Sequence, residues 1–173
     1  TTTKEQGNNC STELINSMPG IYYMLDSAGR LISWNAQLKH VTQFTDKEIA
    51  QSTALDFFEA NDRTHVENNI RKAFEIGETS VEGMLKAGDG TKIPYHFTGK
   101  RIIQDGRPVL IGLGTDVSKR KQAEATARKS SEELAAIFDS SKVSIAYIKN
   151  NVIIKNNCRF DEVFGYEPGE SIG

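Results

Sequence analysis

Two short apolar runs with turn residues between them lie near the start of the chain. Residues 21–25 (Ile-Tyr-Tyr-Met-Leu) and 30–34 (Arg-Leu-Ile-Ser-Trp) are rich in β-branched and aromatic side chains, and the residues between them include Asp and Gly. This pattern predicts a β-hairpin. Three further strands are predicted in the same way, with glycine-containing turns between them, at residues 80–86, 93–103 and 109–117.

Between the hairpin and these three strands, the apolar spacing becomes that of helices. The first part predicts short helical pieces, one of which starts at Thr45, with Glu48 placed to complete a capping box. A longer helix follows, for which Asn61 or Asp62 is the expected N-cap and Gly77 the expected C-cap. The order of elements predicts an α+β fold, a five-stranded antiparallel sheet with helices on one face.

A second long helix is predicted directly after the last strand. Residues 118–138 contain neither Gly nor Pro and many strong helix formers, and Asp116 is placed to cap them. Small and apolar residues recur there at alternating spacings of four and three, the pattern of a weak coiled-coil seam that pairs with another helix. The seam consists of Ala123, Ala127, Ser130, Leu134 and Ile137.

Part of the chain occurs twice. Residues 35–38 (Asn-Ala-Gln-Leu) are matched by residues 157–160 (Asn-Cys-Arg-Phe), an offset of 122 residues that also pairs Ile15 with Ile137. A repeat of this length suits a whole small domain rather than a solenoid unit. We therefore expect one complete module followed by the first part of another, in a chain that is a piece of a longer protein.

Composition and charge narrow the class of protein. The chain has 173 residues, of which 38% are hydrophobic and 25% charged, with a net charge of −2. These values are close to globular averages, and they offer no basic surface for nucleic acid. Two cysteines are too few for a disulfide framework, and no apolar run approaches the ~20 residues of a membrane span. We expect a cytoplasmic protein with no nucleic-acid partner and no direct membrane contact.

Several motifs, taken in order, resemble those of a PAS module and its trailing helix. The most telling is Gly-Thr-Asp-Val-Ser-Lys-Arg-Lys-Gln-Ala-Glu at 114–124, which is similar to the string that leads from the last strand of that family into the signalling helix. The other motifs are Met-Pro-Gly-Ile-Tyr at 18–22, the stretch from Asp to Trp-Asn at 26–35, Phe-Thr-Asp-Lys-Glu-Ile at 44–49 and Gly-Asp-Gly-Thr at 88–91.

The resemblance implies a sensory or regulatory module of a bacterial signalling protein, with a histidine kinase or a cyclic-di-nucleotide enzyme as its output domain. No nucleophile with a base and an orienting group can be assembled, so we expect no catalytic residue in the chain. The implied organisation is an N-terminal segment at 1–12, a PAS domain at 13–117, a connector helix at 118–138 and a truncated start of a second PAS domain at 139–173.

Flavin, bound as a photoadduct to a cysteine, is one candidate cofactor. Residues 157–160 match the flavin-photoadduct motif of light-sensing members letter for letter, but Cys158 precedes Gly165 and Tyr166, whereas the reactive Cys of those members follows this pair. The equivalent position in the complete module falls near Ala54, which has no thiol. We therefore interpret Cys158 as a thiol on a short helix.

Haem is the second candidate cofactor, and it requires a histidine as axial ligand. His65 lies on the long helix, near the place from which haem-bearing members supply an axial ligand, and it equally suits a solvent-facing position. Strand alternation places His96 on the face opposite Tyr95 and Phe97. No pair of histidines has metal-ligand spacing, so we expect no metal site and no tightly bound cofactor.

What remains is the cup between the sheet and the helices. We expect either that its side chains fill the core completely, which we favour, or that they surround a small organic ligand. The expected walls are Tyr23, Leu25, Leu38, Val41, Phe44, Phe57, Phe58, Val66, Ile70, Phe74, Met84, Tyr95 and Phe97; all but Leu25 and Phe57 are candidate ligand contacts.

The signal is expected to leave the module through the strand that ends at Val117. Asp116 belongs to this strand by its backbone and caps the connector helix by its carboxylate, so it is the expected hinge. The residues assigned to signalling are Thr115, Asp116, Lys119 and Arg120. We expect a homodimer formed through the N-terminal segment and the connector helix, because the helical seam needs a partner; the alternative function is a ligand-free dimerisation module.

Overall fold

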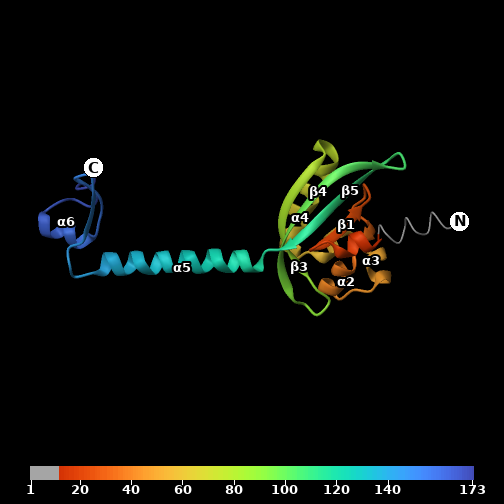
Figure 1. The fold of residues 1–173 in the computed structure, drawn as a ribbon, viewed down its shortest axis with the longest axis horizontal. Helices are drawn as coiled ribbons and strands as arrows, with labels where there is room; N and C mark the ends of the chain where they lie inside the picture. Colours follow the sequence, from red (N-terminus) through yellow and green to blue (C-terminus); the bar gives the residue numbers. More distant parts are fainter. Residues whose placement is uncertain (1–11) are drawn as a thin grey trace. The chain divides into compact units, whose positions relative to one another are not determined.

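The computed structural model describes residues 12–173, which fall into two compact units, one ending at Lys119 and the other running from Arg120 to Gly173 (Figure 1). Apart from Thr12, the predicted N-terminal segment lies outside the described residues. None of the helices in the described part of the chain is long and apolar enough to cross a membrane.

The first unit is built on one antiparallel sheet. Its strand order is β2-β1-β5-β4-β3, so that β5 is the central strand and pairs with both β1 and β4. The five predicted strands are confirmed, as is the α+β fold class. Their bounds are Ile21–Leu25 (β1), Leu31–Trp34 (β2), Glu78–Lys86 (β3), Lys92–Gln104 (β4) and Arg107–Asp116 (β5).

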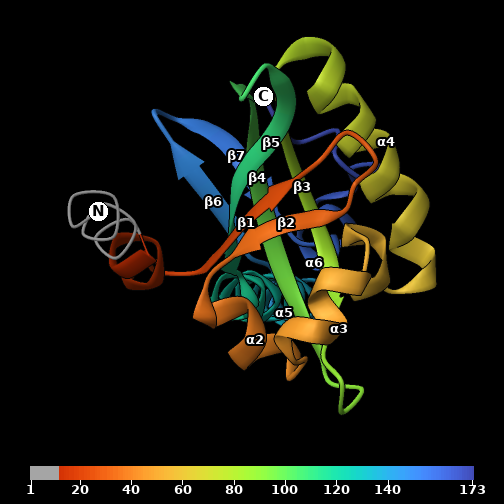
Figure 2. The same cartoon turned by 90° about the vertical axis from the view of Figure 1, so that its right-hand side faces the viewer.

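Helices cover one face of this sheet (Figure 2). The predicted capping box is confirmed, because the Thr45 side chain accepts from the backbone N–H of Glu48 while Glu48 Oε2 accepts from the backbone N–H of Thr45 at 2.8 Å. The helical elements are α2 (Ala36–Thr42), α3 (Asp46–Gln51), the 3₁₀ turn η1 (Ala54–Phe57) and α4 (Ala60–Ile76).

The start of α4 differs from the prediction. The N-cap is Glu59, so Asn61 and Asp62 lie inside the first turn. Asp62 uses its carboxylate elsewhere, because Oδ2 accepts from the backbone N–H of Met84 on β3 at 2.7 Å and so fastens the helix to the sheet edge. The other end is as predicted, since Gly77 closes the helix in the left-handed conformation, with φ of 103°.

The core lies between the sheet and the helices, and glycines on β5 make room for its aromatic rings. A Cβ atom at Gly112 would overlap the Tyr23 hydroxyl, and one at Gly114 would overlap the Phe97 ring. The Phe97 ring is in edge contact with Tyr23 and Phe58, at centroid distances of 5.9 and 5.3 Å. One aromatic cluster therefore joins strands β1 and β4 to the segment before α4.

The second unit contains most of helix α5 (Ser118–Ser140), which begins in the first unit, and a small hairpin with one helix. Strands β6 (Ala146–Lys149) and β7 (Val152–Asn156) pair antiparallel, and α6 (Cys158–Phe164) follows them. The predicted long helix is thus observed, two residues longer than expected at its end. Its seam residues Leu134 and Ile137 are 64% and 66% exposed.

A buried asparagine organises the start of the first unit. Asn35, which is 1% exposed, accepts through Oδ1 from the backbone N–H groups of Tyr22 and Leu38 at 3.1 and 3.3 Å. Its Nδ2 donates to the carbonyls of Gly20 and Ile15 at 2.9 and 3.4 Å. One side chain therefore caps α2 and ties it to β1 and to the helical residues before β1.

Asn157 makes the same four hydrogen bonds in the second unit, and it too is 1% exposed. Its Oδ1 accepts from the N–H groups of Ile145 and Phe160 at 2.9 and 3.1 Å, and its Nδ2 donates to the carbonyls of Val143 and Phe138 at 2.9 and 3.0 Å. The repeat predicted from sequence is therefore also a repeat of hydrogen bonds.

The hydrogen bonds correct the alignment of the repeat. Tyr22 N–H reaches an asparagine 13 residues later, whereas Ile145 N–H reaches one 12 residues later, so the second hairpin is one residue shorter. The offset of 122 therefore holds only after the hairpin turn. Before it, Ile15 corresponds to Phe138, and the predicted pairing with Ile137 is wrong by one residue.

Candidate functional site

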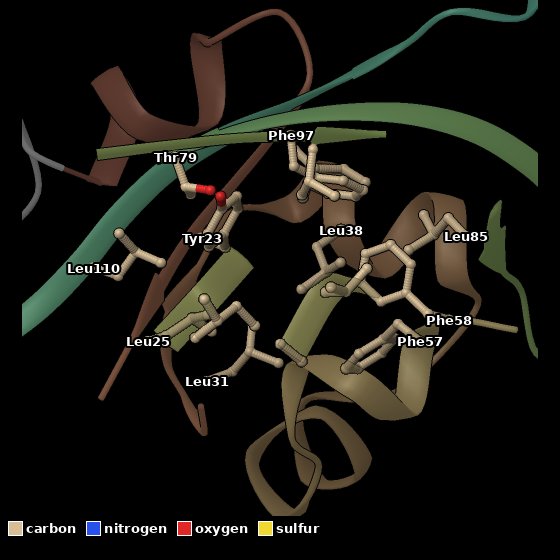
Figure 3. Close-up of a pocket in the computed structure, with 15 residues that line it drawn as sticks. Tyr23, Leu25, Leu31, Leu38, Phe57, Phe58, Thr79, Leu85, Phe97 and Leu110 are labelled. Atoms are coloured by element: carbon tan, nitrogen blue, oxygen red, sulfur yellow. The ribbon is translucent and has the colours of Figure 1, made fainter. Parts of the chain in front are cut away.

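An apolar cavity of about 50 Å³ lies inside the first unit, between the inner face of the sheet and the helices (Figure 3). All five strands, the helices α2 and α4 and the turn η1 contribute to its wall. The lining residues are Ile21, Tyr23, Leu25, Leu31, Leu38, Ala54, Phe57, Phe58, Val66, Ile70, Thr79, Val81, Leu85, Phe97 and Leu110. The expectation of a core with no cavity is therefore not met.

Eight of the thirteen expected wall residues line the cavity. They are Tyr23, Leu25, Leu38, Phe57, Phe58, Val66, Ile70 and Phe97. The other five lie elsewhere. Val41 and Tyr95 line a separate surface hollow beside Asp116, Phe74 lines another hollow, and Phe44 packs on Phe57 behind the wall. Met84 is outside the lining because its neighbour Leu85 points inward instead.

The prediction missed seven lining residues, which are Ile21, Leu31, Ala54, Thr79, Val81, Leu85 and Leu110. For β3 a signal was available in the sequence. Residues at alternate positions of a strand share one face, and Thr79, Val81 and Leu85 are separated by even numbers of residues. For Ala54 no pattern exists, because it lies in a four-residue 3₁₀ turn.

Two hydroxyl groups are the only polar side-chain groups in the wall. The Tyr23 hydroxyl donates to the backbone carbonyl of Thr98 at 3.0 Å, and burial raises the pKa of this phenol far above its ordinary value. Tyr23 is therefore neutral at any physiological pH. In the view of Figure 3 the oxygen atoms of Tyr23 and Thr79 lie at one side of the cavity.

Asp116 stands where the sheet meets the helix that leaves it. Its backbone is the last of β5 and pairs with Tyr95 on β4, while its Oδ1 accepts from the backbone N–H of Ser118, the first residue of α5, at 2.7 Å. The backbone N–H of Val117 donates to the carbonyl of Pro94 at 3.0 Å. Two hydrogen bonds therefore attach the start of α5 to strands β5 and β4. The expected cap differs in detail, because Val117 occupies the N-cap position of α5, and Asp116, one residue earlier, binds the N–H of the first helical residue.

The remaining residues assigned to signalling surround this junction in the chain. Thr115 is exposed and pairs with His96 on β4. Lys119 is exposed on the first turn of α5, and Arg120 Nη1 forms an ion pair with Glu124 Oε1 at 2.9 Å. Burial, and then the charge of Asp116, raise the pKa of Tyr95, so the aromatic ring nearest the junction also stays neutral.

The histidines and Cys158 lie away from the cavity. His65 is exposed on α4 beside Asn69 and does not line the cavity. His96 Nε2 lies 2.7 Å from Ser80 Oγ, on the sheet face opposite Tyr95 and Phe97, as predicted. Cys158 is exposed on α6. Within residues 12–173, no group of three or more His, Cys, Asp or Glu residues is placed to hold a metal ion.

Comparison with known proteins gives one family. The model of the family described as PAS domain matches residues 19–119 of the chain. The sensor histidine kinase TmoS of Ectopseudomonas mendocina is 25% identical over 145 residues, which cover 79% of this chain and 15% of that kinase. The chain therefore spans a small part of that relative.

Solved structures with low identity share the fold. The PAS domain of an HTR-like protein from Haloarcula marismortui has a TM-score of 0.59 at 17% identity, covering 65% of this chain and 93% of that one. The N-terminal domain of a diguanylate cyclase with a PAS/PAC sensor, from Marinobacter aquaeolei, has a TM-score of 0.51 at 16% identity, covering 59% and 98%. At this level of identity, the likeness shows the fold of the first unit.

Proposed function

Because the chain belongs to the PAS domain family, we propose that it is a sensory module that relays a change in its core through helix α5 to an output domain. The names of the relatives support a histidine kinase or a cyclic-di-nucleotide enzyme as that output. The chain itself then carries no catalytic group, and it works in the cytoplasm as one part of a longer signalling protein.

The double role of Asp116 carries this proposal. Leu110 of β5 lines the cavity, and six residues later the same strand ends at the carboxylate that holds the first N–H of α5. A hydrogen bond of this kind contributes ~1 kcal/mol. Two-state equilibria in signalling proteins are biased by differences of a few kcal/mol, so one such bond is large enough to matter. A shift of β5 therefore changes the stability of the first turn of α5.

The buried asparagines support the organisation proposed for the rest of the chain. Asn157 binds the carbonyl of Phe138 near the end of α5 as Asn35 binds the carbonyl of Ile15 ahead of β1. We infer that residues 118–138 are a connector helix that ends on the start of a second PAS domain, residues 139–173. Under this reading, α5 leaves one module and leads into the next.

A dimerisation module is the second candidate function. The seam of α5 is favoured as a contact because Leu134 and Ile137 are both about two-thirds exposed, at 64% and 66%. Pairing the same face of two α5 helices would bury these side chains in a parallel or antiparallel coiled coil. Both candidate functions are compatible with a homodimer, and only the first requires a change in the core.

The test of the relay is a pair of substitutions at Asp116 in the 173-residue chain. Asp116→Ala removes the acceptor for the Ser118 N–H, whereas Asp116→Asn keeps an amide oxygen that accepts from it. We expect amide hydrogen exchange in the first two turns of α5 to rise about fivefold in Asp116→Ala, the factor that corresponds to ~1 kcal/mol. Exchange should stay near the original rate in Asp116→Asn, and β1 to β5 should stay protected in both. Equal exchange in all three proteins would refute the relay.

A further inference from the structure

The wall of the cavity offers almost nothing that a polar ligand needs. Thirteen of its fifteen lining residues are apolar, and Tyr23 and Thr79 are the exceptions. The Tyr23 hydroxyl already donates its proton to the Thr98 carbonyl. Thr79 pairs with Gly99, whose Cβ position lies 3.1 Å from the Tyr23 hydroxyl, so both hydroxyls belong to the same end of the cavity. The other walls present only carbon.

Charge complementarity is missing as well. The lining contains no Asp, Glu, Lys, Arg or His. A carboxylate, phosphate or ammonium group moved into it would lose its water and gain no counter-charge, which is strongly unfavourable. Water itself is a poor occupant, because apolar cavities without convergent polar partners stay dry. The chemistry of the wall therefore selects uncharged, apolar molecules.

The volume limits the size of the occupant. At about 50 Å³, the cavity is roughly a third of the ~150 Å³ apolar cavity that binds benzene or xenon in another protein. Pockets for drug-sized or larger ligands measure roughly 300–1,000 Å³. The space therefore suits xenon or a molecule of a few carbon atoms, and a benzene ring enters only if the surrounding side chains move.

Building on the sensory function proposed above, we propose that this cavity binds one small, uncharged, apolar molecule, such as a short hydrocarbon. Such an occupant restores van der Waals contacts that the side chains around the void lack. Leu110 of β5 and Phe97 of β4 are among those side chains, and both strands reach the Asp116 junction. Occupancy therefore acts on the two strands that hold the start of α5.

The test uses xenon and a matched pair of small molecules on the 173-residue chain. Xenon is located by crystallography under pressure, and ligand contacts are followed by NMR of the methyl groups of Leu38 and Leu110. Ala54→Leu adds carbon atoms to the wall and fills the space, whereas Ala60→Leu makes the same change at an exposed position of α4. Cyclopropane and acetate are similar in size and differ in charge.

We expect one xenon site in the cavity of the unaltered chain and of Ala60→Leu, and none in Ala54→Leu. Cyclopropane should shift the methyl resonances of Leu38 and Leu110 in a saturable way, and acetate at the same concentration should shift them less than a tenth as much. A cavity without xenon, xenon retained in Ala54→Leu, or equal shifts with acetate would overturn the proposal. If Ala54→Leu fails to fold, Thr79→Leu fills the same space from the sheet.

The result of this ligand-binding test can be told apart from the result of the hydrogen-exchange test of the relay. Without xenon or cyclopropane binding, but with the exchange difference between Asp116→Ala and Asp116→Asn intact, the ligand class is overturned and the relay stands. Binding in the cavity with no exchange difference between those variants supports the ligand class and overturns the relay.

Discussion

Asn35 offers the sharpest test of how the first unit is held together. Asn35→Ala removes the N-cap of α2, which costs ~1 kcal/mol. It also leaves the buried N–H of Tyr22 without its acceptor, which costs ~1–3 kcal/mol. We therefore expect the free energy of unfolding to fall by about 2–4 kcal/mol, a large part of the ~5–15 kcal/mol typical of a domain.

The assay is urea denaturation followed by tryptophan fluorescence. Trp34 is the single tryptophan of the chain and lies beside Asn35, so its signal reports the first unit. Asn16→Ala is the matched control, because the Oδ1 of exposed Asn16 accepts a hydrogen bond from the Ala36 N–H at 2.8 Å, and the loss of this bond should cost below ~1 kcal/mol. A loss in Asn35→Ala no greater than in Asn16→Ala would refute the assigned role of the four hydrogen bonds.

Two further predictions concern charge and packing. A hydrogen bond from Lys39 is the largest of the causes that lower the pKa of Asp46. The stability that this bond gives the folded protein is therefore present above the ordinary Asp pKa of about 3.9, and it is lost as pH falls through the lower pKa of the folded state. The difference in urea midpoint between the unaltered chain and Lys39→Met should therefore shrink on acidification, and a difference independent of pH would contradict this. Gly114→Ala places a methyl group against the Phe97 ring and should cost about 1–3 kcal/mol. In a Phe97→Leu background the cost measured by denaturation should be smaller, and an unchanged cost would count against the contact.

The sequence predicted best those features that depend on neighbours in the chain. The Thr45 capping box, the Gly77 C-cap and the five strands each follow from residues a few positions apart, so local chemistry suffices to locate them. The N-cap of α4 shows the limit. Asp62 has the right side chain for a cap, but its carboxylate binds the Met84 N–H on β3, 22 residues away in the chain.

The cavity could be predicted only in outline. Apolar residues identify the elements around the core, but each face is settled by packing, as Leu85 lining the cavity in place of Met84 demonstrates. A void of about 50 Å³ is the small difference between the space that the sheet and helices enclose and the volume of the side chains that fill it. No sequence motif encodes such a difference. The predicted alignment of the repeat was likewise wrong by one residue before the hairpin, where Ile15 corresponds to Phe138. The reason is that the two hairpins differ in length by one residue, which the matched motif after them does not reveal.

The central claim is that the state of the cavity reaches α5 through Asp116. The direct measurement is amide hydrogen exchange of the first two turns of α5 in four proteins: the unaltered chain, Ala54→Leu, Asp116→Ala and the double variant. The account predicts that filling the cavity by Ala54→Leu changes this exchange when Asp116 is present and has no effect when it is replaced by Ala. The same response to Ala54→Leu with and without the Asp116 carboxylate would contradict it.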